Sequence, residues 1–370
     1  MVAKTLGGRA NTMMSNIRTI IESPADWRGP EIAARADWIH RFTDVEIDEV
    51  ERALRSLQAR GVAIGRMRRE DFPLATLAAI LLDARERLET GPGLHLLRGF
   101  PVARYSRDEL RLIYWGMCLH IGTAMSQSSA GDVIGDVRNL NVDVNSAAGR
   151  AYTSKQRLTF HSDQADVVGL WVMQTAREGG VSMIASALAV RNEILRRRPD
   201  LLEVIYRPFY WSWQQQAPPG SPPWYVQPVY SEQDGHFASC YIRTHIRSAQ
   251  RFPQVPRLSA AQEEALDLVD SLAGSEAFHF ATLFEPGDLQ LLNNHVILHS
   301  RTAFEDWPEP ERRRHLLRIW LSVPNSRPLN ASMAPIFRDT RAGAVRGGFP
   351  SRSGTLVHET PGFAGSMEST

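Results

Sequence analysis

The strongest constraint on this chain is a short segment, Leu158-Thr-Phe-His-Ser-Asp163, which contains the only His-x-Asp in the sequence. In an extended segment, side chains two residues apart point the same way, so His161 and Asp163 can reach one ion. A second histidine, brought in from a distant strand, would complete a set of two imidazoles and one carboxylate. That set leaves adjacent coordination positions open and suits non-haem Fe(II) that handles dioxygen.

The segment from 311 to 322 is the second constraint, because its pattern predicts a β-strand with two unlike faces. One face is almost wholly apolar and suits a core, whereas the other carries Arg314 and Arg318. Buried guanidiniums are tolerated only when they are paired and hydrogen-bonded. A dicarboxylate cosubstrate would supply the partner, since a guanidinium fork matches a carboxylate. The alternative is a basic edge strand in water.

Two histidines compete for the role of the second imidazole ligand. His295 and His299 lie four residues apart and would share one face of a strand. Spacing alone therefore leaves both of them open.

Several motifs follow one another along the chain: His161-x-Asp163, Gly179-Gly180-Val181-Ser182, Asn293 to His299, and Arg314 with Arg318. In this order they resemble the taurine dioxygenase (TauD/TfdA) family of Fe(II)- and 2-oxoglutarate-dependent oxygenases. The segment 93–100 also resembles the strand that opens the family's catalytic core, so matching segments run from about Gly93 to Leu321. Many relatives have Gly-Gly-x-Thr where this chain has Ser182, which keeps the hydroxyl. The resemblance is to an uncharacterised bacterial branch, so it does not transfer a substrate.

The resemblance implies a set of metal ligands. His161, Asp163 and His299 would hold Fe(II), because Asn294, five residues before His299, selects that histidine in the family register. His295 then becomes a packing or supporting residue. Related halogenases lack the carboxylate, so Asp163 disfavours halogenation.

The resemblance also implies how the cosubstrate is bound. Arg314 would bind the distal carboxylate of 2-oxoglutarate, helped by the hydroxyl of Ser182. Arg318 would lie near the metal-chelating end of 2-oxoglutarate or near an acidic group of the substrate. Fe(II), 2-oxoglutarate and O2 are thus the expected cofactor and cosubstrates.

The expected reaction is oxidation of an unactivated C–H bond in a small carboxylate-bearing, amino-acid-like substrate, with hydroxylation as the default. It would be coupled to decarboxylation of 2-oxoglutarate to succinate and CO2. The alternatives are desaturation or ring formation by the same iron chemistry, and a non-catalytic metabolite-binding protein of the same fold. Two histidines and a carboxylate also suit a zinc hydrolase, but no general base is evident beside the metal and the inward arginines would be unexplained.

Substrate contacts are expected from Arg157, Asn141, Gln127, Phe160 and Arg318. Arg157 precedes His161 by four residues, where relatives place a substrate-contacting residue. An exposed arginine at a strand end is the alternative. The segment 137–145, which contains Asn141, alternates apolar and polar residues and would present the polar ones to a cavity or to solvent.

We expect a mainly β protein with flanking α-helices, built on a double-stranded β-helix (jelly-roll, clavaminate synthase-like) core with surrounding helices. Residues 1–92 would form a helical segment packed on this core and 93–325 the catalytic domain, with an insertion at about 186–285. Residues 326–370 would be an extension whose end is disordered. Capping boxes predict helices after Thr43, Ser106 and Ser259, and apolar spacing predicts another over 72–88. Strands are predicted at 94–97, 158–160, 170–175, 182–185, 289–292 and 315–321.

The remaining expectations concern the partners of the protein, its cellular location and one aromatic segment. A net charge of +1 gives no reason to expect nucleic acid or membrane as partners, and no apolar run is long enough to span a bilayer. The two cysteines, Cys118 and Cys240, favour a reducing, cytoplasmic location. We expect a small-molecule substrate, and a homo-oligomer is compatible with the sequence. The aromatic, proline-rich segment 208–230 predicts an ordered loop or an edge hairpin, either packed on the body or covering the active site.

Overall fold

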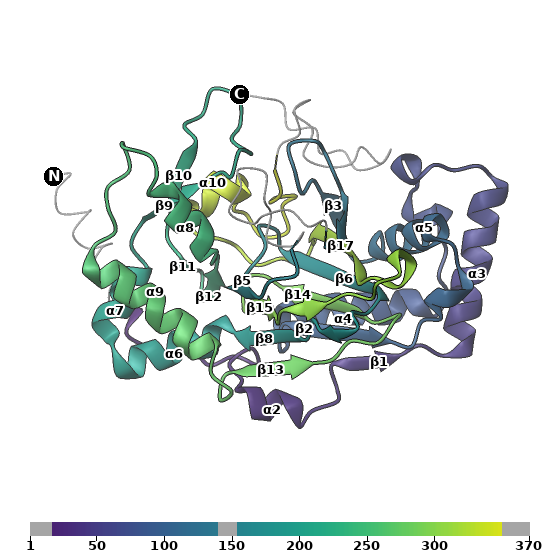
Figure 1. Ribbon diagram of the computed structural model, residues 1–370, viewed down its shortest axis with the longest axis horizontal. Helices are drawn as coiled ribbons and strands as arrows, with labels where there is room; N and C mark the ends of the chain where they lie inside the picture. Colours follow the sequence, from purple (N-terminus) through teal and green to yellow (C-terminus); the bar gives the residue numbers. More distant parts are fainter. Residues whose placement is uncertain (1–16, 140–153, 350–370) are drawn as a thin grey trace.

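The computed structural model describes residues 17–139 and 154–349, and within them it forms mixed β-sheets covered by helices (Figure 1). The larger sheet has seven strands in the order β1-β2-β14-β6-β17-β3, and β4 also pairs with β17. Every pairing in it is antiparallel except β1 with β2. Its strands are β1 (Ile39–Arg41), β2 (Leu94–Arg98), β3 (Thr123–Met125), β4 (Ile134–Val137), β6 (Val167–Gln174), β14 (Leu289–Asn293) and β17 (His315–Ser322).

A four-stranded antiparallel sheet carries both histidines of the expected metal site. Its order is β13-β8-β15-β5, and His299 on β15 is the direct cross-strand partner of His161 on β5. The pairing of β5 with β15 brings residues 138 positions apart in the sequence into contact, which is the convergence that the His-x-Asp motif requires. The strands are β5 (Leu158–His161), β8 (Ser182–Ser186), β13 (His279–Thr282) and β15 (Ile297–Arg301).

Three two-stranded ribbons complete the β structure. One is β9 (Phe209–Ser212) with β10 (Trp224–Gln227), which confirms an ordered hairpin in the aromatic, proline-rich segment. The others pair β11 (Tyr230–Gln233) with β12 (His236–Ser239), and β7 (Glu178–Gly179) with β16 (Phe304–Glu305).

Helices surround the sheets, with α3 and α5 at one end and α6, α7 and α9 at the other (Figure 1). The predicted capping boxes are confirmed at Thr43, Ser106 and Ser259. The α-helices are α2 (Gly29–Ala33), α3 (Asp44–Ala59), α4 (Leu77–Thr90), α5 (Arg107–Cys118), α6 (Ala187–Arg197), α7 (Pro199–Ile205), α8 (Arg243–Ala249), α9 (Ala260–Ala273) and α10 (Ala334–Phe337). Short 3₁₀ turns lie at Ile64–Arg66, Arg69–Asp71, Val102–Arg104, Pro310–Arg312 and Ala331–Met333.

The predicted start of α4 was wrong, because the helix begins at Leu77 and not at Phe72. Phe72 precedes a proline, which disfavours helical geometry at that residue. The side chain of Glu49, on α3, accepts hydrogen bonds from the backbone N–H groups of Thr76 and Leu77 at 2.7 and 3.1 Å. The cap therefore comes from another helix, and local sequence carries no signal for it.

The strand β17 has the two unlike faces that its sequence predicts. Leu317, Ile319 and Leu321 are buried in a core shared with α3, α4 and α5. Arg314, just before the strand, and Arg318 within it both line a cavity beside the histidines. A strand of this kind joins the hydrophobic core directly to the functional site.

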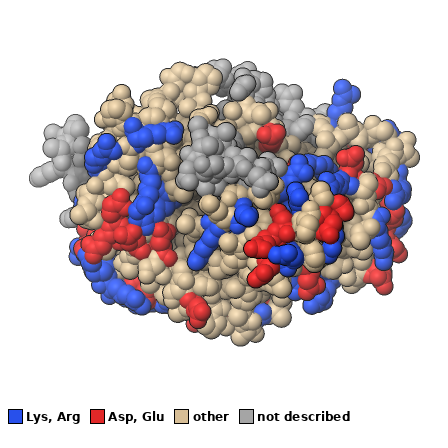
Figure 2. Space-filling model, viewed as in Figure 1, with Lys and Arg blue, Asp and Glu red and all other residues tan. Residues whose placement is uncertain are grey.

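The surface agrees with the neutral charge balance of the chain. Figure 2 shows basic and acidic side chains adjoining one another over the helices at both ends of the visible face. Exposed ion pairs on the helices, such as Arg198 with Asp200 at 2.7 Å, agree with such neighbouring charges. In the described ranges, no helix combines the length and the apolar character that a membrane crossing needs.

Candidate metal and cosubstrate site

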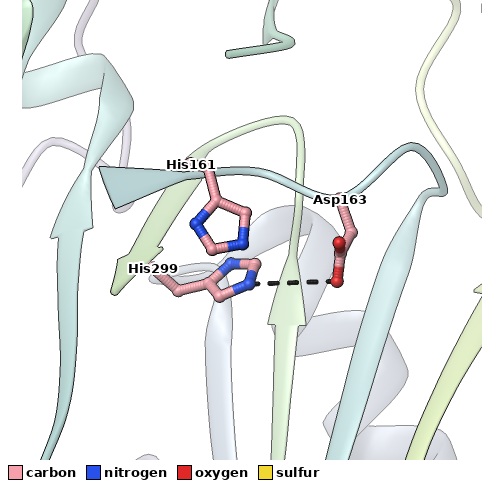
Figure 3. A group of neighbouring side chains, drawn as sticks. All are labelled: His161, Asp163 and His299. Atoms are coloured by element: carbon pink, nitrogen blue, oxygen red, sulfur yellow. Dashed lines mark ion pairs between the residues drawn. The ribbon is translucent and has the colours of Figure 1, made fainter. Parts of the chain in front are cut away.

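His161, Asp163 and His299 converge at the end of the four-stranded sheet (Figure 3). One ligand atom from each residue lies within 4.8 Å of the others, and all three side chains point toward one another. The Nε2 of His299 is 3.8 Å from Oδ2 of Asp163, too long for a hydrogen bond but short enough for both atoms to bind one ion. The predicted triad is thus assembled in space.

The backbone fixes which nitrogen of His161 is available. Its Nδ1 lies 2.8 Å from the carbonyl oxygen of Thr159, which can only accept, so Nδ1 carries the proton and Nε2 presents a lone pair. Burial lowers the pKa of His161, and burial together with His161 lowers the pKa of His299 to about 3. Both imidazoles are therefore neutral at ordinary pH, as metal ligation requires.

Asp163 is held in its ionised form. Burial raises its pKa, but the charge of the neighbouring Arg318 guanidinium lowers it, and the net shift is downward. Nη1 of Arg318 lies 3.4 Å from Oδ1, while Oδ2 has no hydrogen-bond partner among the described residues. A buried carboxylate oxygen without a partner is costly, and a cation bound there would satisfy it.

The loop that carries Asp163 is held by hydrogen bonds from three directions. The carboxamide of Asn294 accepts from the backbone N–H of Asp163 at 3.0 Å and donates to the carbonyl of Ala165 at 3.0 Å. Ser162 and Tyr241 exchange two further hydrogen bonds. Gln164 donates to the hydroxyl of Tyr225 at 2.7 Å, which connects the loop to the β9–β10 hairpin. The carboxylate of Asp163 is thereby presented by a rigid turn.

Arg314 is the most unusual charge in the site. It is 5 % exposed, its Nη1 has no partner, and among the described residues no carboxylate lies within ion-pair distance of its guanidinium. Burial lowers its pKa to about 9, with a further contribution from Arg301. Gly180 makes room for it, because a Cβ there would lie 3.2 Å from Arg314 Nε. A buried cation without an anion predicts an anionic ligand.

Arg301 was missed by the sequence reasoning, although its position two residues after His299 was a usable signal. It lies on the same strand as His299 and lines the same cavity. Burial lowers its pKa to about 10, and its Nη1 is also without a partner. The cavity is bounded by Val137, Leu158, His161, Leu170, Ser182, Phe284, His299, Ser300, Arg301, Arg314, Leu316 and Arg318.

Ser182 stands beside these arginines. It is the cross-strand partner of Arg301, so the two side chains share one face of the sheet. Its hydroxyl is 3.3 Å from Oε1 of Gln290, and it also lines the cavity. Ser182, Arg301 and Arg314 form one polar end of the cavity, and the histidines form the other.

Arg318 and Gln127 form a connected pair. The Nε of Arg318 donates to Oε1 of Gln127 at 2.7 Å, and the carboxamide nitrogen of Gln127 donates to the carbonyl of Arg318 at 3.0 Å. Gln127 was predicted to contact substrate, and in the structure its carboxamide holds the guanidinium of Arg318 in place. Arg318 itself lies where the prediction placed it, beside the metal ligands.

The other predicted residues have different positions. Phe160 is buried in the core with its ring 5.8 Å from that of His279, so packing accounts for it. Arg157 is exposed at the start of β5, and Asn141 lies outside the described residues. His295 contacts Asp166 at 2.9 Å in a buried pair, which agrees with a supporting role and not with ligation.

Two histidines and a carboxylate beside a buried, unpaired arginine define the class as a non-haem iron oxygenase that uses a dicarboxylate cosubstrate. Residues 55–320 match the family described as "Taurine catabolism dioxygenase TauD, TfdA family", and the chain belongs to it. The protein is therefore an Fe(II)- and 2-oxoglutarate-dependent oxygenase, and O2 is its oxidant.

Curated relatives come from a bacterium and a fungus. FR-33289 synthase of Streptomyces rubellomurinus is 26% identical over 325 residues, which cover 87% of this chain and 96% of that protein. The taurine hydroxylase-like protein SAT17 of Stachybotrys chartarum is 31% identical over 307 residues, covering 79% and 77%.

Solved structures share the fold. An asparagine oxygenase in complex with Fe(II), 2S,3S-3-hydroxyasparagine and succinate superposes with a TM-score of 0.60 at 17% identity, covering 77% of this chain and 93% of that one. The non-haem iron oxygenase OrfP, in complex with Fe and alpha-ketoglutaric acid, superposes with a TM-score of 0.57 at 15% identity, covering 82% and 100%.

Proposed function

We propose that this oxygenase hydroxylates an unactivated C–H bond of a small, carboxylate-bearing, amino-acid-like molecule. The observation that carries the proposal is the convergence of His161, Asp163 and His299 next to the buried, unpaired Arg314. Support for the substrate class comes from fold relatives whose structures hold hydroxylated asparagine and hydroxylated arginine. Arg318 supports it as well, since a guanidinium at the metal suits a carboxylate.

The proposed metal ligands are His161 through Nε2, Asp163 and His299. Bound Fe(II) would supply the oxidising chemistry at the substrate carbon. The protein's own part is to keep both imidazoles neutral by burial, to hold the Asp163 carboxylate ionised, and to exclude water from the cavity.

The proposed cosubstrate contacts are Arg314 and Ser182 at the distal carboxylate of 2-oxoglutarate. Arg318 would lie at the metal end, where Gln127 fixes its orientation. For the substrate, Arg318 and the exposed Arg157 remain candidate partners of an acidic group, and Asn141 is retained from the sequence alone.

An anaerobic titration of the purified apoprotein tests this assignment. Fe(II) and then 2-oxoglutarate are added while the visible metal-to-ligand charge-transfer band is followed. The band should appear with the wild type and be lost in His161→Ala and Asp163→Ala, because each removes a ligand. Arg314→Ala should weaken 2-oxoglutarate binding by about 2–5 kcal/mol, since it removes a guanidinium that would pair with the buried distal carboxylate.

Two results would contradict the proposal. No band from a folded, iron-loaded wild type would mean that the cosubstrate is not chelated there. Full turnover in either ligand variant would remove the metal assignment. Once the band is established, release of succinate in the presence of candidate amino acids identifies the substrate.

The finer architecture is also a proposal. We infer a double-stranded β-helix core over 93–325, with residues up to 92 packed on it and an insertion at about 186–285. The two larger sheets, in which strands far apart in the sequence pair almost entirely antiparallel, support this core. Two buried, free cysteines support a reducing, cytoplasmic location.

A further inference from the structure

The polar end of the cavity holds two guanidiniums where one would suffice to meet a carboxylate. Arg301 and Arg314 are each 5 % exposed, and each has an Nη1 atom buried without a hydrogen-bond partner. Within 17–139 and 154–349, neither is within ion-pair distance of a carboxylate. The other buried arginines each have one, namely Arg191, Arg243, Arg318, Arg327 and Arg346. The two charges are therefore left for a ligand.

The strands place Arg301 at the same point as the residues already assigned to the distal carboxylate. Arg301 is the direct antiparallel partner of Ser182. The phenyl ring of Phe304 lies 4.6 Å from the guanidinium carbon of Arg301 and 5.1 Å from that of Arg314. All of Ser182, Arg301 and Arg314 border one cavity.

The remaining contacts of Arg301 fix its orientation. Its Nε donates to the carbonyl of Thr302 at 3.2 Å, and its Nη2 donates to the carbonyl of Ser154 at 2.8 Å and to that of Gln156. Neutral carbonyls hold the guanidinium in place but do not neutralise it. Nη1 is the guanidinium nitrogen that has no hydrogen-bond partner, and the guanidinium carries a full positive charge.

We propose that Arg301 is a second cationic anchor for the distal carboxylate of 2-oxoglutarate, so that this carboxylate is held by two guanidiniums and the Ser182 hydroxyl. A carboxylate has two oxygens with about four lone-pair sites, so Arg301 and Arg314 can each donate to it without competing. This inference rests on the proposed function, because it assumes that 2-oxoglutarate chelates the metal at the other end of the cavity. The consequence is strong selection for a 2-oxo acid with a second carboxylate.

The test compares two ligands that chelate iron in the same way. 2-Oxoglutarate has the distal carboxylate, whereas 2-oxopentanoate has the same carbon chain without it. Dissociation constants are measured by anaerobic titration of the Fe(II)-loaded protein for the wild type, Arg301→Gln and Arg301→Lys. The matched control is Arg177→Gln, which removes an exposed arginine paired with Glu305 on the adjoining ribbon.

Arg301→Gln removes the charge and leaves a shorter, neutral amide donor. It should weaken binding of 2-oxoglutarate by about 10- to 100-fold, the size expected for one hydrogen bond to a charged group, and leave that of 2-oxopentanoate unchanged. Arg301→Lys should recover part of the loss, and Arg177→Gln should behave as the wild type. A merely structural Arg301 would weaken both ligands equally or neither.

The outcomes separate the two proposals. If the wild type binds 2-oxoglutarate and Arg301→Gln keeps the wild-type ratio of the two dissociation constants, the second anchor is refuted and the proposed function stands. If the wild type binds neither 2-oxo acid, the proposed function fails. If Arg301→Gln does not fold, Arg301→Lys decides. The dissociation constant of 2-oxopentanoate divided by that of 2-oxoglutarate must then be smaller in Arg301→Lys than in the wild type, because an anchor selects for the distal carboxylate.

Discussion

At the scale of single residues, the site depends on Asn294, which does not touch the expected metal. Its carboxamide is 1 % exposed and bonds both the backbone N–H of Asp163 and the carbonyl of Ala165. Asn294→Ala should release the turn and lower the affinity for Fe(II) by about 10- to 100-fold, as loss of a supporting hydrogen bond does at other metal sites. Isothermal titration of the apoprotein with Fe(II) under anaerobic conditions measures the change.

The neighbouring Asn293 provides a matched control. It bonds the carbonyl of Leu88 and the backbone N–H of His295, away from the loop of Asp163. Asn293→Ala should lower the free energy of unfolding by about 1–3 kcal/mol, because it leaves buried groups unpaired, with little effect on Fe(II) affinity. Equal losses of Fe(II) affinity in both variants would show that Asn294 acts only through overall stability.

At the scale of elements, the β9–β10 hairpin is connected to the site by aromatic contacts. Trp213 lies 4.4 Å from Tyr225 and 6.4 Å from Phe349, and Phe349 lies 5.8 Å from Trp320 on β17. Trp213→Leu should loosen this side of the site, so that water enters and succinate is released without substrate at a higher rate. Measuring succinate at saturating 2-oxoglutarate, with no substrate added, tests the hairpin as a cover.

Trp224 on the same hairpin is the comparison. Its ring packs on Tyr210 at 5.2 Å, and it is less buried than Trp213. Trp224→Leu should therefore leave substrate-free succinate release near the wild-type rate. If Trp213→Leu folds, binds Fe(II) and releases succinate without substrate no faster than the wild type, the hairpin does not cover the active site.

At the scale of the whole molecule, buried histidines predict how stability depends on pH. Burial lowers the pKa of both His95 and His295 to about 4, well below their ordinary value of 6.5. Between these values the unfolded chain binds protons that the folded chain does not, so stability falls as the pH falls from 6.5 to 4. The slope is up to about 1.4 kcal/mol per pH unit for each histidine.

Urea denaturation of the metal-free protein at pH 7, 6, 5 and 4.5 measures this slope. Neither ring nitrogen of His95 has a hydrogen-bond partner among the described residues, so His95→Gln removes a titrating group without breaking a bond. The free energy of unfolding should fall less steeply with falling pH in the variant than in the wild type, by up to about 1.4 kcal/mol per pH unit. An unchanged slope would mean that His95 titrates normally in the folded protein.

Much of the site was predictable from sequence, because its signals are local. The alternation on β17 identified Arg314 and Arg318, and the His-x-Asp spacing identified two of the expected ligands, since strand periodicity is a property of the backbone. The capping boxes of α3, α5 and α9 were equally local, and the structure confirms them.

Tertiary structure alone decided the contacts between distant segments. Glu49 caps α4 from another helix, Gln127 binds Arg318 from a residue 191 positions away, and Phe160 packs in the core instead of facing the cavity. Tertiary structure likewise decided that Arg301 and Arg314 have no carboxylate partner among the described residues. Whether a buried charge has a partner depends on which strands are neighbours and in what register, and neither property is written in the local pattern of residues.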